Sequence, residues 1–191
     1  MVQLAHQRFT FAEYIRVEET SAIKHEFLDG VVYAMAGGSP DHAAIAGNLI
    51  RLLSVALDGK RCRVFTSDLR VRASKTGLVT YPDVSVICDR VELDPEDTKG
   101  HTALNPTLLV EVLSPSTEDY DRGEKLSHYK RIDSLREVMF VAHDEQRVDL
   151  WRRTGGHWTQ LTFRAADSVL LESVSCAIPL AEIYRDPLAS P

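Results

Sequence analysis

The sequence predicts a mixed α/β (α+β) domain with a central mixed sheet flanked by helices. Three observations predict it: a helical pattern after Thr10, a second after Ser39, and short runs rich in Val and Ile around and after them. No internal repeat or low-complexity segment suggests another architecture. Because 191 residues is the length of one ordinary domain, we expect a single domain over residues 1–191.

The first elements are predicted to be a helix and a hairpin. Thr10 and Glu13 form a capping box in front of FAEYIRVEE, which marks the start of a helix. Residues 23–35 are two half-apolar runs joined by Asp29-Gly30, a pair that tolerates the positive φ angles of a tight turn. We therefore expect two antiparallel strands there.

The second helix is predicted from Ser39-Pro40, an N-cap followed by a first-turn proline, up to Gly59. Another helix is expected over residues 117–132. The strand-like runs are RCRVFTS (61–67), LRVRA (69–73), VTYPDVSVI (79–87), TLLVEVL (107–113) and REVMFVA (136–142), followed by hairpins over 147–178 with a turn at Gly155-Gly156.

Composition and charge exclude several classes of protein. The net charge is −6, so a nucleic acid or an anionic membrane would need a local basic surface. The amino-terminal residues do not resemble a signal peptide, and no apolar run could cross a membrane, so we expect no membrane partner and a cytoplasmic location. The three cysteines, Cys62, Cys88 and Cys176, form no CxxC pair, which argues against a disulfide framework and fits a reducing compartment.

Glu111 interrupts a run that is apolar enough for a strand covered on both faces. An ionised carboxylate in such a place is costly unless it is paired or bound to a metal. The alternative is that Glu111 emerges at the end of the sheet and pairs with an arginine.

Asp83 is a second acid in an apolar run, and the two acids favour a shared explanation. If their strands are neighbours, one divalent cation could relieve the repulsion between the carboxylates. Magnesium is commonly held by one or two carboxylates together with water and substrate phosphate. The alternative for Asp83 is a turn residue that follows Pro82.

Asp121, Lys125 and Tyr129 are spaced four apart and so share one face of the predicted helix. Lys125 could then reach back toward the end of the strand that carries Glu111. The alternative is an exposed Asp121–Lys125 ion pair, worth about 0.3 kcal/mol.

Together these motifs resemble the Uma-two family, which belongs to the PD-(D/E)XK nuclease superfamily. The resemblance lies in Pro82-Asp83, in Glu111 within VEVLSPST, and in the D-x-x-x-K-x-x-x-Y spacing of residues 121–129. It covers roughly residues 8–185 and implies a restriction-endonuclease-like core. The superfamily motif has a lysine two residues after the acid, where this chain has Leu113, so Lys125 resembles a migrated substitute.

The resemblance implies a metal-dependent endonuclease that hydrolyses phosphodiester bonds in DNA, with Mg²⁺ or Mn²⁺ as the cofactor, in a fold that often forms homodimers. The implied metal ligands are Asp83, Glu111 and the carbonyl of Val112, with Lys125 as base or charge stabiliser. The supporting residues it implies are Glu26, His42 and Tyr129. The alternative for His42 is a helix cap or a surface residue, which a lone histidine near a helix start more often is.

Two other functions fit the same residues. The chain could be a catalytically inactive nucleic-acid or protein-binding module. It could also be a metal-dependent hydrolase of small phosphate esters, since a pair of carboxylates does not by itself determine the substrate.

Residues 60–75 hold six basic side chains and one acid and are the predicted nucleic-acid surface. The candidate residues are Lys60, Arg61, Arg63, Arg70 and Arg72, with Lys75 beside them. The alternative is the solvent-facing side of two exposed strands.

Overall fold

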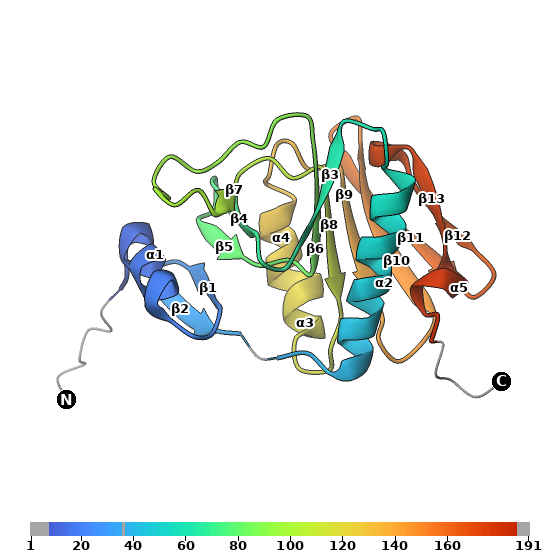
Figure 1. The fold of residues 1–191 in the computed structure, drawn as a ribbon, viewed down its shortest axis with the longest axis horizontal. Coiled ribbons are helices and arrows are strands. Elements are labelled where there is room, and N and C mark those ends of the chain that lie inside the picture. Colours follow the sequence, from blue (N-terminus) through green and yellow to red (C-terminus); the bar gives the residue numbers. More distant parts are fainter. Residues whose placement is uncertain (1–7, 36, 187–191) are drawn as a thin grey trace.

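The computed structural model of the protein describes residues 8–35 and 37–186. Within these residues the strands form a six-stranded, a five-stranded and a two-stranded sheet. Helix α2 (Pro40–Ala56) covers one face of the six-stranded sheet, and a helical segment over residues 118–129 covers the other (Figure 1). This confirms the predicted fold class, a mixed sheet between helices.

The six-stranded sheet lies at the centre of the molecule. Its strands, in spatial order, are β11 (His157–Arg164), β10 (Arg147–Thr154), β9 (Glu137–Val141), β8 (Leu108–Val112), β6 (Val84–Cys88) and β3 (Cys62–Thr66). β8 and β9 are parallel, and the other neighbours are antiparallel. In β8, Val110 packs toward α2 and Leu109 toward the opposite helical segment, so both faces are buried.

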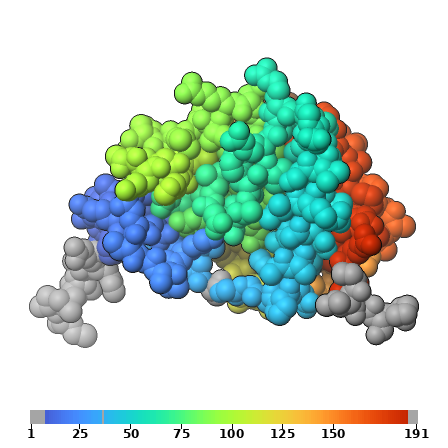
Figure 2. All heavy atoms as spheres, in the orientation of Figure 1, coloured from blue at the N-terminus to red at the C-terminus, as the bar shows by residue number. Residues whose placement is uncertain are grey.

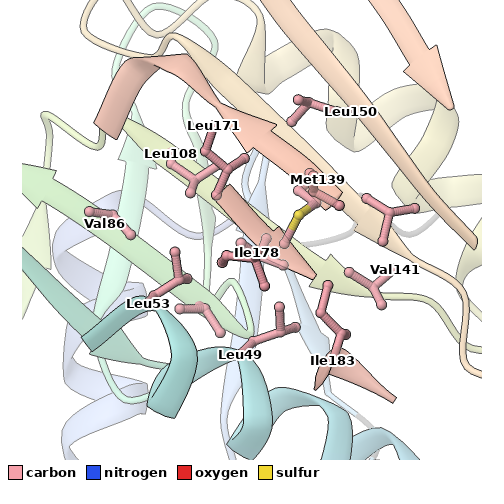
Figure 3. Close-up of a cluster of buried hydrophobic side chains, with 14 of the residues drawn as sticks. Leu49, Leu53, Val86, Leu108, Met139, Val141, Leu150, Leu171, Ile178 and Ile183 are labelled. Atoms are coloured by element: carbon pink, nitrogen blue, oxygen red, sulfur yellow. The ribbon is translucent and has the colours of Figure 1, made fainter. Parts of the chain in front are cut away.

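Helix α2 begins as predicted, with Ser39 as N-cap and Pro40 in the first turn. Leu49 and Leu53 are fully buried and lie against Val86 and Leu108 of the sheet (Figure 3). Burying one leucine side chain contributes roughly 1.5–3 kcal/mol. This packing fixes where the amino-terminal turn of α2 lies relative to β6 and β8.

The helical segment on the other face consists of α3 (Glu118–Tyr120), a π-helical turn (Asp121–Lys125) and α4 (Leu126–Tyr129). One continuous helix was predicted here, and the π-helical turn was not. Leu126 and Tyr129 are buried against the sheet. π-helical turns are rare and frequently occur at functional sites, so this turn makes the segment a candidate part of such a site.

The five-stranded sheet joins the amino-terminal residues to the rest of the molecule. Its order is β2 (Val31–Ala34), β1 (His25–Leu28), β5 (Leu78–Thr80), β4 (Arg70–Ala73) and β7 (Thr102–Ala103). The predicted capping box starts α1 (Phe11–Thr20), whose Tyr14 packs on this sheet. The predicted turn is present, with positive φ at Asp29 and Gly30.

Residues 79–87 were predicted as one strand, and this prediction is wrong. Val79 lies in β5 of the five-stranded sheet, whereas Val84 begins β6 of the six-stranded sheet. Pro82 has no N–H to donate to a strand ladder, so the pairing stops there and the chain changes sheets. As a result Asp83 lies where the two sheets meet.

The carboxyl-terminal residues complete the core beside α2. They form β12 (Ser168–Leu171), a 3₁₀ turn (Glu172–Val174), β13 (Cys176–Pro179) and α5 (Leu180–Ile183). The predicted hairpin turn at Gly155-Gly156 is present between β10 and β11, with positive φ at both glycines. No helix in the described part of the chain is long and apolar enough to cross a membrane.

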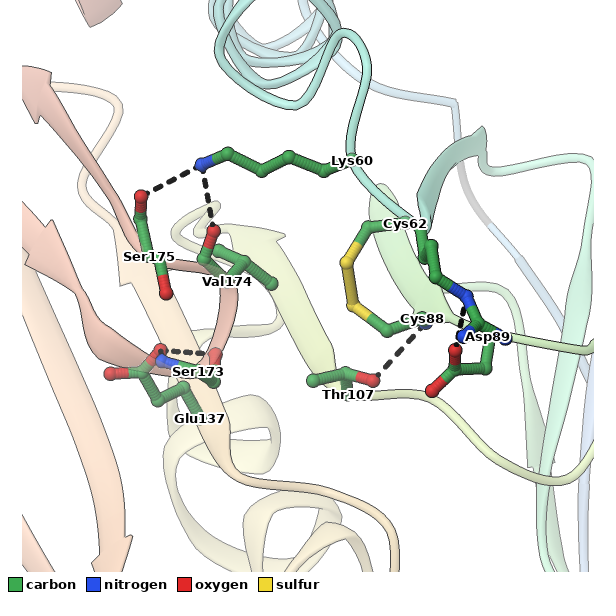
Figure 4. The surroundings of a disulfide bond; sticks show 10 residues. Lys60, Cys62, Cys88, Asp89, Thr107, Glu137, Ser173, Val174 and Ser175 are labelled. Carbon is green, nitrogen blue, oxygen red and sulfur yellow. Dashed lines mark hydrogen bonds and ion pairs between the residues drawn. A yellow bond between two sulfur atoms is a disulfide. The ribbon is translucent and has the colours of Figure 1, made fainter.

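Cys62 and Cys88 form a disulfide between β3 and β6, which corrects the expectation of no disulfide (Figure 4). The two residues face each other in the strand register, a proximity that their scattered positions in the sequence do not reveal. Cys176 is a free thiol.

Candidate active site

Asp83 directly precedes β6 and Glu111 lies in β8, the antiparallel neighbour of β6, as a shared site requires. Val84 of β6 pairs with Val110 of β8, and the same register continued by one residue places Asp83 opposite Glu111. Opposite residues in such a pair have Cβ atoms about 5 Å apart. Asp83 Oδ2 accepts the backbone N–H of Val112 at 2.8 Å, so the Asp83 carboxylate is held at the end of β8.

Lys125 is buried at the centre of three carboxylates. Its Nζ lies 3.0 Å from Glu111 Oε1, 3.0 Å from Glu26 Oε1 and 3.4 Å from Asp121 Oδ1. The side chain of Lys125 is 5% exposed, which excludes the alternative of a solvent-exposed Asp121–Lys125 pair. The carboxylate of Glu111 pairs with this lysine and with no arginine among the described residues.

Glu26 connects the amino-terminal hairpin to this cluster. It lies in β1, and its Oε1 accepts the hydroxyl of Thr80 as well as the Lys125 ammonium. Its Oε2 accepts the hydroxyl of Tyr120 at 3.2 Å. Thr80 and Tyr120 were not predicted as site residues, and their spacing in the sequence carries no signal of these contacts.

Tyr129 donates its hydroxyl to Glu111 Oε1 from the far end of the helical segment. Burial, and then the charge of Glu111, raise the pKa of Tyr129 well above its usual value. The phenol therefore stays protonated and remains a hydrogen-bond donor to the carboxylate.

His42 lies in the first turn of α2, where its backbone N–H donates to the Ser39 hydroxyl. Its ring Nε2 is 3.2 Å from Asp83 Oδ2. The hydrogen bond to Asp83 raises the pKa of His42, against the effect of burial. A Cβ on Gly38 would lie 2.6 Å from His42 Nδ1, so glycine leaves the room that the imidazole occupies.

Carboxylates outnumber cations in this cluster. Glu26, Asp83, Glu111 and Asp121 gather around one ammonium and one imidazole. Burial raises the pKa of Glu111 to about 8, against the effect of Lys125, and the charges of Asp121 and Asp83 raise it further. Burial would lower the pKa of Lys125, but Glu111 and the other acidic groups outweigh this and raise it well above the usual value.

The cluster opens into a cavity of about 1490 Å³ between the hairpin β1–β2, the start of α2 and residues 111–125. Along the lower edge of Figure 2 the amino-terminal residues and the first turns of α2 lie side by side. The side chains from the cluster that line the cavity are those of Glu26, His42, Asp83, Glu111, Tyr120, Asp121 and Lys125. A substrate in this cavity would therefore meet the carboxylates directly.

The donor set fits a hard divalent cation. Among the described residues the polar contacts of Asp83 are all made by Oδ2, and those of Glu111 by Oε1, so each carboxylate has a second oxygen without a partner. No three His, Cys, Asp or Glu side chains in residues 8–35 and 37–186 form a ready-made metal site. Mg²⁺ usually completes its shell with water and substrate oxygens, so two carboxylates are sufficient protein ligands.

Replacing Glu111 with glutamine should stabilise the metal-free protein at alkaline pH. The folded-state pKa of Glu111 is raised from 4.5 to about 8, so wild-type stability falls as pH rises between these values. The loss is at most about 1.4 kcal/mol per pH unit, and the amide removes it. Unfolding by denaturant in the presence of a chelator should therefore show that wild type and Glu111→Gln are equally stable at about pH 5. At about pH 8 Glu111→Gln should be the more stable protein.

The matched control is Glu124→Gln, because the Glu124 side chain is exposed and lies in the same π-helical turn. It should leave the pH dependence of stability unchanged. A large loss of stability in Glu111→Gln at every pH would instead make Glu111 a structural partner of Lys125.

Arg70 and Arg72, predicted as part of a nucleic-acid surface, are placed in ion pairs. Arg70 is 3% exposed and its Nη2 lies 2.9 Å from Asp97 Oδ2. Arg72 Nη1 contacts Asp94 at 2.8 Å and Glu96 at 2.9 Å. The prediction of an exposed guanidinium at Arg70 is therefore wrong, because acids from the polar stretch 89–106 fold over these strands.

The other basic residues of the predicted surface lie away from the cavity. Lys60 donates to the carbonyls of Val174 and Ser175 (Figure 4), and Arg61 pairs with Asp89 at 2.9 Å. Both lie beside Cys62, which faces Cys88 at the opposite end of β6 from Asp83, roughly 16 Å along the strand. Arg63 is exposed, contacts the ring of Phe65, and does not line the cavity.

Comparisons with known proteins show the family of the chain. Residues 11–180 match the model of the Uma2 family, described as "Putative restriction endonuclease". The chain belongs to the Uma2 family. Two proteins of Synechocystis sp. (strain PCC 6803) are similar over nearly their whole length. The uncharacterized protein slr1290 is 39% identical over 91% of this chain and 90% of its own, and the uncharacterized protein sll1609 is 30% identical over 90% and 96%.

The fold of this Uma2 protein also matches a solved structure. A crystal structure from Anabaena variabilis, described as "a putative nuclease belonging to DUF820", superposes with a TM-score of 0.69 over 86% of this chain and 91% of its own, at 18% identity. That likeness shows the fold. Family membership supports a nuclease of the restriction-endonuclease type, and the resemblance seen in the sequence is confirmed.

Proposed function

We propose that this protein is a metal-dependent endonuclease that hydrolyses phosphodiester bonds in DNA, and that residues 1–191 act as one domain. The observation that carries the proposal is the excess of buried carboxylates over cations at the cavity, around Lys125 and Asp83. Such an excess favours a bound cation, because unpaired buried charge is costly. Membership of the Uma2 family supports the nuclease class.

Asp83, Glu111 and the carbonyl of Val112 are the proposed ligands of Mg²⁺ or Mn²⁺. A cation bound there would neutralise charge on the phosphate and activate a water for in-line attack. The chain prepares the site with two fixed contacts: the Val112 N–H holds Asp83, and the Tyr129 hydroxyl holds Glu111. His42 holds Asp83 from the other side, which agrees with a supporting role.

Lys125 is better suited to stabilise charge than to act as a base. Its pKa is raised well above the usual value by Glu111, Glu26 and Asp121, so the ammonium keeps its proton at neutral pH. A protonated amine beside the scissile phosphate would stabilise the charge that develops on its oxygens. Glu26 then acts as a positioning residue, because it holds the ammonium from the hairpin side.

The substrate and its setting are proposed from the family alone. DNA is the proposed substrate, and the homodimer and the cytoplasmic location remain predictions from the sequence. Among the predicted phosphate contacts, Arg61 and Arg63 stay exposed.

The test is a calorimetric titration of Mn²⁺, up to millimolar concentration, into wild type and Asp83→Ala. We expect at least about tenfold weaker binding in the variant, because the variant lacks a ligand. The control Asp133→Ala removes an exposed acid far from the cavity and should bind as wild type does. Circular dichroism and thermal unfolding confirm that the variants fold.

Equal Mn²⁺ binding in wild type and Asp83→Ala would make Asp83 structural. A module that binds nucleic acid or protein without cleavage would then describe this chain better.

A further inference from the structure

Four cations gather where α4 ends, near the start of β8 and so at the opposite end of that strand from Glu111. Lys130 and Arg131 follow α4, Arg136 precedes β9, and Arg153 lies in β10. Arg153 contacts the backbone of two of the others. Its guanidinium donates to the carbonyl of Lys130 at 2.5 Å, and its backbone N–H donates to the carbonyl of Arg136 at 2.8 Å. We call Lys130, Arg131, Arg136 and Arg153 the distal basic surface.

These cations have little compensation from acids. Arg131 and Arg136 are exposed, and among the described residues their side chains make no hydrogen bond or ion pair. The nearby acid Asp133 is already paired with Lys75 at 2.5 Å. Burial, and then the charge of Arg136, lower the pKa of Arg153, and the charge of Asp133 offsets this only in part. An anion bound between Arg136 and Arg153 would relieve the repulsion of these like charges.

Two tryptophans hold the surface in place. Lys130 Nζ lies 3.4 Å from the centre of the Trp151 ring, and Arg153 Cζ lies 4.8 Å from the centre of the Trp158 ring. A cation over the face of an aromatic ring is attracted by the ring's electrons, so these contacts order both side chains. Because these two cations are already ordered, binding a ligand would cost less side-chain entropy than binding to free lysines and arginines.

The surface lies within reach of a polymer that occupies the active site. In Figure 1 the helical segment runs from α3, at the site, to α4, so the distal basic surface is at its other end. Asp121 and Lys130 are nine residues apart, roughly 14 Å along a helix. That is about the length of four base pairs at 3.4 Å each.

We propose that the distal basic surface binds the phosphate backbone of a nucleic acid outside the active site. The occupant follows from charge: four neighbouring cations share one nearby acid, Asp133, which is itself paired with Lys75, and on a protein whose net charge is −6 such a local excess of positive charge suits a repeating anion. The choice of nucleic acid over an acidic peptide rests on the proposed function, since the active-site cavity is argued to take a phosphodiester. Backbone contacts of this kind are independent of base sequence.

The experiment measures binding of a fluorescently labelled DNA duplex by anisotropy, in a chelator that prevents cleavage, over a series of salt concentrations. The variant is Arg131→Gln/Arg136→Gln. Each phosphate contact contributes about 0.9 to the slope of log affinity against log salt. We therefore expect the double variant to bind more weakly at low salt and to lose about 1.8 from that slope.

The matched control is Arg51→Gln/Arg164→Gln, which removes the same charge from two exposed residues that are paired with Glu182 and Glu145. It should keep the wild-type slope. Equal losses in both double variants, or no loss in Arg131→Gln/Arg136→Gln, would overturn the proposal. Displacement of the duplex by poly-glutamate at equal charge would also overturn it, in favour of an acidic protein partner.

This outcome is separate from that of the proposed function. Mn²⁺ binding that depends on Asp83 can succeed while the salt slope is unchanged, and a lost slope can be measured even if the protein cleaves nothing.

Discussion

Replacing Lys125 with methionine should reduce metal-dependent phosphodiester cleavage by at least about 100-fold, the usual cost of removing a group that stabilises transition-state charge. Methionine keeps much of the length of the side chain and removes the ammonium that lies 3.0 Å from Glu111 and from Glu26. The measurement is the single-turnover rate on a mixture of DNA sequences at saturating Mn²⁺, so that weak metal binding or a missing recognition sequence does not hide the effect.

The same substitution should also destabilise the metal-free protein. Removing one partner of a buried ion pair costs about 3–5 kcal/mol, because the remaining charge is buried without compensation. Here Glu26 and Asp121 would be left without their cation, beside Glu111, whose pKa burial already raises to about 8. Mn²⁺ should therefore bind Lys125→Met more tightly than it binds wild type, and stabilise the variant by correspondingly more.

Lys99→Met is the control, because Lys99 lines a different cavity and should leave both rate and stability near wild type. Undiminished cleavage by a folded Lys125→Met protein would show that the lysine absent at position 113 has no substitute at position 125. The cluster around Lys125 would then be structural.

Local signals in the sequence predicted much of the fold. The capping box at Thr10, the Asp29-Gly30 turn and the Ser39-Pro40 helix start all depend on residues within one turn of each other. A site shared by Asp83 and Glu111 was proposed on the condition that their strands are neighbours, because a carboxylate in an apolar strand needs a partner, and the register of β6 and β8 meets that condition. The helix face that Lys125 shares with Asp121 and Tyr129 indicated that it could reach the strand of Glu111, whereas its burial was not predicted.

Contacts between residues far apart in the chain could not be predicted. Thr80 and Tyr120 both donate to Glu26, although they are far from it in the sequence. Thr80 lies in β5, just before the chain changes sheets at Pro82, and Tyr120 lies in the helical segment over residues 118–129. Cys62 and Cys88 face each other through a strand register that no spacing rule fixes. The basic stretch 60–75 was misleading for the same reason, since its acid partners come from the loop that returns over β4.

Replacing Arg70 with methionine should lower the free energy of unfolding by about 3–5 kcal/mol without changing the salt dependence of DNA binding. The Arg70 guanidinium contacts Asp97 at 2.9 Å and donates to the Thr102 hydroxyl at 3.1 Å, in a region where the Asp97 side chain has no exposed surface. The charge left on Asp97 would retain only the Thr102 hydroxyl and nearby backbone N–H groups as partners.

The control Arg63→Met removes an exposed arginine from β3 and should change stability by less than about 0.5 kcal/mol. The double variant Arg70→Met/Asp97→Leu should recover part of the loss, because it buries no unpaired charge. If Arg70→Met were as stable as wild type but bound DNA with a shallower salt slope, Arg70 would be a phosphate contact after all. The expected result would instead show that Arg70 holds the loop 89–106 on the five-stranded sheet. Phosphate would then be bound by arginines that form no ion pair with an acid.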